Sequence, residues 1–294
     1  MDTLASFFGD QIKRALSHSK VPAIINEHNV YQESDANILP ILDEMVECLL
    51  LPGSGIDGLE NLEELLAKAE SGKSCLILPE HYSNFDLSII SLLTRQGGGR
   101  GNDIANALIA ISGSKLNEDN PAVAAFAGAY TRIVIYPSRY LLDLHAEKNR
   151  AEFMRAKVIN RAALKVLNEK KVSGKMILVF PAGTRFRPWD PESKKGVREI
   201  DSYIRSFDYL CFIAINGEIL HVQKTDMMND ALSKDVIRIT AGPVIPCAEF
   251  HERARLTAGE NDDKKQAVAD AIMAELDKMH VVAEEKRQKL LPSR

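Results

Sequence analysis

Hydrophobic side chains recur at helical spacing in three segments near the start of the chain. The first runs from Leu4 to Leu16, and the second covers about Leu39 to Leu50, with Pro40 tolerated in its first turn. The third covers Leu59 to Ala69. No apolar run in this region is typical of a strand. We therefore expect residues 1–70 to form a small helical N-terminal domain.

From Lys73 the pattern changes to short runs rich in Ile, Val and Leu that alternate with helical segments. The expected strands are Cys75–Leu78, Ala107–Ile111, Ile133–Tyr136, Met176–Phe180, Leu210–Ile215 and Val236–Thr240. The expected helices are Asp86–Thr94, Pro121–Ala129, Asn149–Asn168, Val197–Ser206 and Asp262–Arg287. This alternation predicts an α/β domain over residues 71–294, with a mixed, largely parallel sheet flanked by helices.

Composition and charge narrow the class of partner. The chain has 294 residues, of which 45% are hydrophobic and 27% charged, as is typical of globular proteins. Its formal net charge of −4 argues against general nucleic-acid binding, which needs a basic surface. The four cysteines are dispersed and form no C-x-x-C pair, so we expect reduced thiols, no metal site and a cytoplasmic location.

Any contact with a membrane is expected to be peripheral. Asp2 and Asp10 lie where a secretory signal would have a basic start and an uninterrupted apolar stretch. The apolar runs are only a few residues long, whereas a membrane-spanning helix needs about 20. Phe7 and Phe8 on the first helical face are read as core residues, with a membrane-surface anchor as the alternative.

A histidine and an aspartate follow the first strand of the α/β domain. In Pro79-Glu80-His81-Tyr82-Ser83-Asn84-Phe85-Asp86, a turn between strand and helix can bring the Asp86 carboxylate onto the His81 imidazole. The carboxylate would fix the tautomer and leave the other ring nitrogen to accept a proton from an alcohol. Capping of the helix is the alternative role for Asp86. His221 and Asp226 repeat the spacing in a polar stretch without this context, and are read as coincidence or capping.

Arginines follow two other predicted strands. Met176–Phe180 runs into Pro181-Ala182-Gly183-Thr184-Arg185-Phe186-Arg187-Pro188, and Arg139 follows the strand that ends at Tyr136. In an extended stretch residues two apart face the same way, so Arg185 and Arg187 are expected to grip one phosphate together. A solvated surface charge is the alternative for each arginine.

These segments resemble two sequence blocks of the glycerolipid acyltransferases. ILPEHYSNFD is similar to their His-x4-Asp block, and FPAGTRFRP to a block usually written F-P-E-G-T-R-S. Ala182 stands where most members have Glu, and Phe186 where they have Ser. The resemblance covers about Lys73 to Pro246.

The soluble plastid-type branch, the acyl-carrier-protein:glycerol-3-phosphate acyltransferases, is the most similar part of that family. Its second block reads like P-S-G-G-R-D-R-P, and Arg185 and Arg187 match its two arginines. Arg139 matches a basic residue of that branch, whereas Tyr140 stands where the branch has His. The branch also resembles this chain in having a helical N-terminal domain and no membrane spans.

The resemblance implies transfer of a fatty acyl group from acyl-carrier protein or acyl-CoA to the sn-1 hydroxyl of glycerol 3-phosphate. It makes His81 the general base, Asp86 its orienting partner, and Arg139, Arg185 and Arg187 the phosphate clamp. No cofactor or metal is implied, because an alcohol held against a thioester and deprotonated can react directly. A covalent mechanism through Ser83 or a cysteine is disfavoured, since none lies in a nucleophile motif.

Two other functions stay open at this point. One is a lysophosphatidate acyltransferase, which would share His81 and Asp86 but use an acceptor that already carries a fatty chain. The other is a catalytically silent acyl-carrier or lipid-binding relative, suggested by Ala182 and Tyr140.

Two basic clusters are candidate docking sites for an acidic carrier protein, with solvated helix faces as the alternative. The first lies on the long middle helix and comprises Lys148, Arg150, Arg155, Lys157, Arg161 and Lys165. The second comprises Lys194, Lys195 and Arg198.

Overall fold

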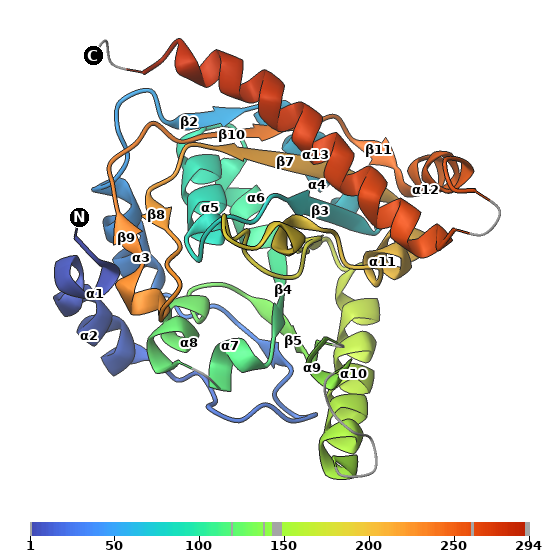
Figure 1. The fold of residues 1–294 in the computed structure, drawn as a ribbon, viewed down its shortest axis with the longest axis horizontal. Coiled ribbons are helices and arrows are strands. Elements are labelled where there is room, and N and C mark those ends of the chain that lie inside the picture. Colours follow the sequence, from blue (N-terminus) through green and yellow to red (C-terminus); the bar gives the residue numbers. More distant parts are fainter. Residues whose placement is uncertain (1, 119, 138, 143–148, 260–261, 292–294) are drawn as a thin grey trace.

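A mixed, mostly parallel sheet forms the centre of the protein, as predicted (Figure 1). The structure is a computed structural model that describes residues 2–118, 120–137, 139–142, 149–259 and 262–291, without the side chains of residues 139 and 142. Within these residues nine strands form the sheet, in the order β1-β5-β4-β6-β3-β7-β10-β2, with β11 paired to β7. Their bounds are β1 (Tyr31–Gln32), β2 (Gly55–Asp57), β3 (Cys75–Pro79), β4 (Leu108–Gly113), β5 (Arg132–Ile135), β6 (Met176–Leu178), β7 (Tyr209–Asn216), β10 (Arg238–Ala241) and β11 (Ile245–Pro246). A separate two-stranded sheet pairs β8 (Leu220–His221) with β9 (Ala231–Leu232).

Five neighbouring strands of the central sheet share one direction. β5, β4, β6, β3 and β7 are all paired in parallel, so their carboxyl ends lie along the same edge. Ile77 of β3, for example, is in register with Leu178 of β6 and Cys211 of β7. Segments far apart in sequence that follow these strands therefore meet at this edge, where ligands bind in open α/β sheets.

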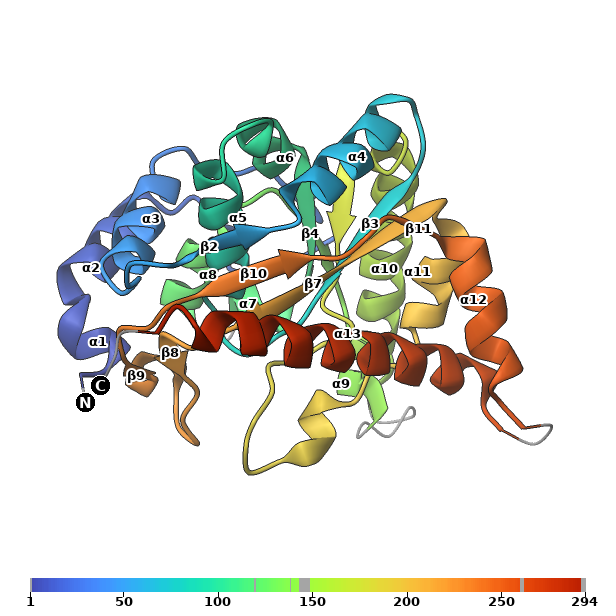
Figure 2. The same cartoon turned by 90° about the horizontal axis from the view of Figure 1, so that it is seen from above.

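Helices cover both faces of the sheet, and Figure 2 shows α4, α5 and α6 on one side and α13 on the other. The first layer is α1 (Leu4–Phe7), α2 (Gly9–His18), α3 (Leu39–Glu47), α4 (Leu59–Glu70), α5 (Asp86–Gln96), α6 (Gly101–Ala107) and α8 (Pro121–Ala127). The second layer is α10 (Arg150–Lys170), α11 (Ile200–Ser206), α12 (Cys247–Leu256) and α13 (Lys264–Gln288). The short turns are α7 (Lys115–Glu118), α9 (Arg139–Leu142), η1 (Pro191–Lys194) and η2 (Met227–Asn229).

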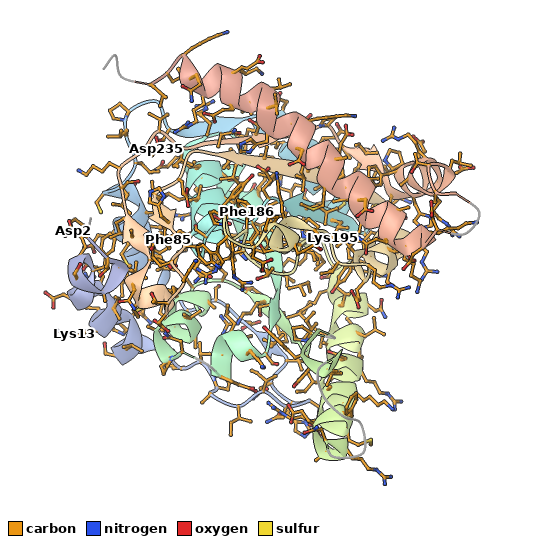
Figure 3. The ribbon with its side chains drawn as sticks, viewed as in Figure 1. Asp2, Lys13, Phe85, Phe186, Lys195 and Asp235 are labelled. Carbon is orange, nitrogen blue, oxygen red and sulfur yellow. The ribbon has the colours of Figure 1, made fainter. Side chains whose placement is uncertain are left out.

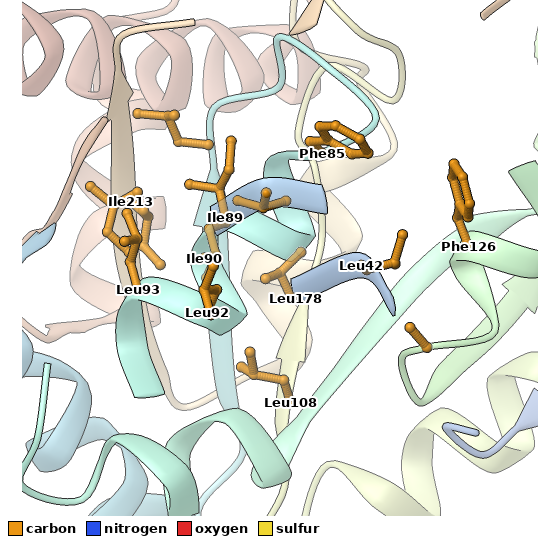
Figure 4. Packing of buried hydrophobic residues seen from close by; sticks show 14 of the residues in the cluster. Leu42, Phe85, Ile89, Ile90, Leu92, Leu93, Leu108, Phe126, Leu178 and Ile213 are labelled. Carbon is orange, nitrogen blue, oxygen red and sulfur yellow. The ribbon is translucent and has the colours of Figure 1, made fainter. Parts of the chain in front are cut away.

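Two buried clusters lie between the sheet and these layers, because side chains alternate along each strand. Cys75 and Ile77 of β3 belong to the cluster with α1–α6 and α8, part of which Figure 4 shows. Leu76 and Leu78 belong to the cluster with α10–α13. Since β3 is buried on both faces, it reads as a continuous apolar run, which is why the sequence revealed it.

The first seventy residues contain two strands that the sequence analysis did not predict. β1 pairs with β5 and β2 with β10, so this region contributes to the central sheet. Each strand has only two or three residues, too few for a periodic pattern to reveal. Leu42 and Leu62 of this region lie in the same buried cluster as Ile77 and Ile213 of the sheet. A domain boundary at residue 70 stays a prediction.

The helices and strands that the sequence predicts are present in the structure, and their ends differ from the predicted ones by a few residues. The first helix is divided into α1 and α2 at Phe8, which is 2% exposed, whereas Phe7 is 50% exposed. The core reading of that pair therefore holds for Phe8 and is wrong for Phe7. The sequence pattern does not predict the helix α12. Within the described residues, no helix has the length and apolar composition needed to cross a membrane.

Candidate active site

His81 and Asp86 form a hydrogen-bonded pair just beyond the carboxyl end of β3. The distance from His81 Nδ1 to Asp86 Oδ2 is 2.8 Å. The Asp86 carboxylate also accepts from the backbone N–H of Tyr82 at 2.6 Å, and from the N–H and hydroxyl of Ser83 at 2.8 to 3.0 Å. Its side chain is 2% exposed and that of His81 is 17% exposed. The predicted contact is confirmed, and the catalytic role stays a prediction.

Asp86 does not cap the helix that it begins. Phe85 is the N-cap residue of α5, and the donors to the Asp86 carboxylate precede it in the chain. Ile89, Ile90 and other apolar residues bury α5 against the sheet, as Figure 4 shows in part. The carboxylate is therefore fixed by a buried helix on one side and by the turn that carries His81 on the other, which favours the orienting role over capping.

The His81 ring is held on a second side by Phe180, which follows β6. The two rings stack with centroids 3.9 Å apart and planes inclined by 20°. Because Nδ1 faces a carboxylate, the tautomer with the proton on Nδ1 is favoured. The other ring nitrogen, Nε2, has no hydrogen-bond partner in the described part of the chain. This nitrogen can accept a proton from a bound hydroxyl group.

The segment 181–188 with the two arginines is bonded directly to the His81 turn. The backbone N–H of Phe186, which lies between Arg185 and Arg187, donates to the His81 carbonyl at 2.8 Å. Phe186 lies near the centre of the molecule in Figure 3. The turn at the start of the segment requires Gly183, whose φ of +63° is in the left-handed region. The two sequence blocks thus meet, as expected for segments that follow the neighbouring strands β3 and β6.

The two guanidinium groups have different neighbours. Arg185 Nη1 donates to Asp230 Oδ2 at 2.9 Å, and this carboxylate is 1% exposed. Arg187 Nη2 donates to the Thr184 hydroxyl at 3.3 Å, and its Nη1 is 3.7 Å from Asp190. Their joint grip on one phosphate stays a prediction.

Asp230 holds Arg185 in place at an electrostatic cost. Burial raises the pKa of Asp230, although the N–H of Gln223, at 2.8 Å, and the Arg185 guanidinium both act to lower it. Arg185 itself is 21% exposed and uses one of its two terminal nitrogens for this pair. This partner could not be predicted from local sequence, because Asp230 lies 45 residues further along the chain.

The third predicted cation, Arg139, begins α9, but its side chain lies outside the described part of the structure. A neighbouring cation is described: Lys115 Nζ lies 4.2 Å from the centre of the Tyr140 ring. Lys115 follows β4 and Tyr140 follows β5, so both belong to the edge that holds His81. Lys115 is not among the cations predicted from the sequence, although it follows the strand β4 just as Arg139 follows β5.

The second His-x4-Asp match does not form a pair. His221 Nδ1 lies 3.1 Å from Glu218, and its Nε2 bonds the Ser233 hydroxyl at 2.7 Å. Asp226 caps η2 by accepting from the Met228 N–H at 2.8 Å. The prediction that this copy is a coincidence with a capping residue is confirmed.

The candidate nucleophiles are not activated. The Ser83 hydroxyl donates to Asp86 and is buried. Burial raises the pKa of Cys75, Cys211 and Cys247 to about 12 and also raises that of Cys48, so these groups remain thiols at neutral pH. Within the described residues, no three His, Cys, Asp or Glu side chains are grouped to hold a metal ion.

A search against models of known protein families finds no match to this chain, and a search of curated proteins finds none either. Support for a function therefore comes from the residues at the sheet edge. These are the His81–Asp86 pair and the arginine segment bonded to it.

Proposed function

We propose that this protein transfers a fatty acyl group from an acyl thioester to the sn-1 hydroxyl of glycerol 3-phosphate, for phospholipid synthesis. The observation that carries the proposal is the 2.8 Å hydrogen bond between His81 Nδ1 and Asp86, in a ring whose Nε2 has no described partner. This arrangement supports a role for His81 as a general base, because the carboxylate orients the imidazole and fixes its tautomer.

The reaction needs one base and no covalent enzyme intermediate. The acceptor hydroxyl attacks the thioester carbonyl carbon while His81 Nε2 takes the hydroxyl proton. The carbon–sulfur bond of the tetrahedral adduct then breaks, and the protonated imidazole returns the proton to the departing thiolate. The products are an ester and a free thiol. Holding the hydroxyl group close to the carbonyl carbon, in the orientation for attack, removes much of the entropic barrier.

The arginine segment supports an acceptor that carries a phosphate. Arg185 and Arg187 flank the residue that is hydrogen-bonded to His81, so the base and these cations belong to one bonded unit. Guanidinium groups match phosphate oxygens with two parallel hydrogen bonds. Arg139 remains the third member of the proposed clamp, and Lys115 adds a cation at the same edge.

Helix α10 supports an acidic carrier protein as the donor. Lys157, Arg161 and Lys165 lie on its exposed face and form no ion pair with any described residue. Arg155, by contrast, is paired with Glu118 and Glu152. Lys148 lies outside the described residues. Unpaired cations are available to a partner, so α10 is the preferred dock, with acyl-CoA as the alternative donor.

The second basic cluster, around Lys194, is less available to a carrier protein than the cluster on α10. Lys194 is paired with Asp277 at 2.5 Å, and Arg198 with Asp263 at 3.0 Å. Lys195, labelled in Figure 3, lies next to the first of these pairs in the chain. Because both pairs neutralise local charge, this cluster is the weaker candidate for docking.

A thioester-release assay with a dye that reacts with free thiols tests the proposal. The purified protein is given acyl-carrier-protein or coenzyme A thioesters with glycerol 3-phosphate, with lysophosphatidate, or with neither. Release that depends on glycerol 3-phosphate is the expected result. Release that depends on lysophosphatidate would assign the other acceptor, and the absence of release with either acceptor would favour a silent lipid-binding protein.

A further inference from the structure

A buried carboxylate lies directly before His81. Glu80 is 4% exposed, and its Oε2 accepts from the backbone N–H of Ile215 at 2.8 Å. The same oxygen lies 2.9 Å from His280 Nδ1, and Oε1 accepts from the Tyr82 hydroxyl at 2.8 Å. His280 belongs to α13, 200 residues further along the chain, and Figure 1 shows this helix lying along β7. A distant helix thus reaches the segment that carries the proposed base.

Tyr82, which directly follows His81, is fixed from two directions. Its backbone N–H donates to Asp86 at 2.6 Å, and its hydroxyl donates to Glu80. Its ring also meets the Phe186 ring edge-on, with centroids 6.3 Å apart. The two chain neighbours of His81 are therefore joined by a hydrogen bond to the Glu80 carboxylate, and the same carboxylate contacts His280 of α13.

We propose that Glu80, Tyr82 and His280 form a positioning cluster, which holds the His81 turn in the geometry needed for proton transfer. This inference rests on the proposed acyl transfer. The three residues act through the backbone on either side of His81 and do not touch the substrate. They make the C-terminal helix part of the support of the site.

The cost of burying Glu80 favours this role over simple packing. A buried carboxylate without partners is strongly destabilising, and an apolar residue would close the end of β3 at lower cost. Nor is His280 needed to attach α13 to the sheet. Asn216 Nδ2 donates to Glu284 at 3.0 Å, and Arg287 donates to Asp235 at 2.6 Å. The His280 contact therefore adds a bond to the His81 turn on a helix that is already anchored.

The charges around His280 favour its protonated form. Its hydrogen bond to Glu80 raises the pKa of His280, and Glu284 acts in the same direction, while burial and Lys194 oppose them. Burial and Glu80 raise the pKa of Tyr82, whose other charged neighbours include Asp277 and Asp86. At neutral pH the tyrosine is thus a hydrogen-bond donor, and the Glu80–His280 contact gains ion-pair character.

Variants at His280 separate positioning from helix attachment. His280→Ala removes the donor, whereas His280→Asn keeps an amide N–H close to the place of Nδ1. Because small displacements of a reacting group are costly, we expect His280→Ala to lower kcat about tenfold with little change in the KM for glycerol 3-phosphate. His280→Asn should recover most of that loss. Glu284→Gln, one turn away on α13, is the matched control and should leave kcat close to the wild-type value.

A second readout does not depend on turnover. The His81 Nδ1 proton, bonded to Asp86, should give a downfield proton NMR resonance. We expect it to shift or broaden in His280→Ala and to stay unchanged in Glu284→Gln. If the wild-type protein releases no thiol with glycerol 3-phosphate, the proposed function fails, and the resonance still tests the cluster. Folded His280→Ala with an unchanged resonance, or an equal loss of kcat in Glu284→Gln, would overturn the positioning role.

Discussion

Replacement of Arg185 should have two separable consequences, one for stability and one for catalysis. Arg185→Ala removes the proposed phosphate ligand and also leaves the Asp230 carboxylate, which is 1% exposed, without its cationic partner. The N–H of Gln223 remains as a donor to that carboxylate. A rate measurement on this variant alone would therefore mix the two effects.

The magnitudes follow from the contacts. A hydrogen bond to a charged group contributes about 1.5–3 kcal/mol, so the free energy of unfolding of Arg185→Ala should fall by an amount in this range. Arg185 is 21% exposed, which places the loss toward the lower end. If the same guanidinium binds the acceptor phosphate, kcat/KM for glycerol 3-phosphate should fall roughly ten- to a hundredfold.

Asp230→Asn supplies the matched control. It removes the buried charge but keeps a side-chain oxygen that can accept from the Arg185 guanidinium, so kcat/KM should stay within about threefold of the wild-type value. In the double variant with Arg185→Ala, stability should return while kcat/KM remains low. Thiol release gives kcat/KM, and melting curves give the stability of each variant. Recovery of kcat/KM in the double variant, or wild-type kcat/KM in folded Arg185→Ala, would show that Arg185 only neutralises Asp230.

Three further outcomes are expected. Asp86→Asn should lower kcat by about ten- to a hundredfold, because an amide cannot accept from all the donors that surround the carboxylate; an unchanged kcat would contradict the orienting role. Reversing Lys157 and Arg161 to Glu should raise the KM for acyl-carrier protein and leave that for acyl-CoA unchanged, and KM values unchanged from wild type for both donors would exclude α10 as the dock. Because Glu80 raises the pKa of His280, the stabilising ion pair is complete below about pH 6.5 and is lost as pH rises through the raised pKa. Urea unfolding should then show the stability advantage of wild type over His280→Asn shrinking as the pH rises above about 6.5, and a constant difference would contradict the ion pair.

The sequence predicted the parts of the fold that repeat a pattern over many residues. β3 and β7 are continuous apolar runs because helices bury both faces, and α13 shows its apolar spacing over 25 residues. β1 and β2 were missed because strands of two or three residues carry no period. Their place in the sheet depends on pairing with β5 and β10, which local sequence does not encode.

The candidate site likewise has one part that the sequence predicts and another that it does not. The His81–Asp86 contact was predictable because a single strand–turn–helix unit contains both residues. The partners of the site were not, since Asp230 and His280 reach it from distant segments. The pattern predicts Phe180 as the last residue of a strand, but β6 ends at Leu178, and only the observed stacking shows how Phe180 fixes the His81 ring.

The most direct test of the central claim is thiol release by His81→Ala with glycerol 3-phosphate as the acceptor. Loss of a general base should lower kcat about a hundred- to ten-thousandfold while the protein stays folded, as a cooperative melting curve would show. His221→Ala, whose ring bonds Glu218 and Ser233 away from Asp226, should keep near-normal turnover. Near-normal turnover by folded His81→Ala would contradict the assignment of His81 as the base.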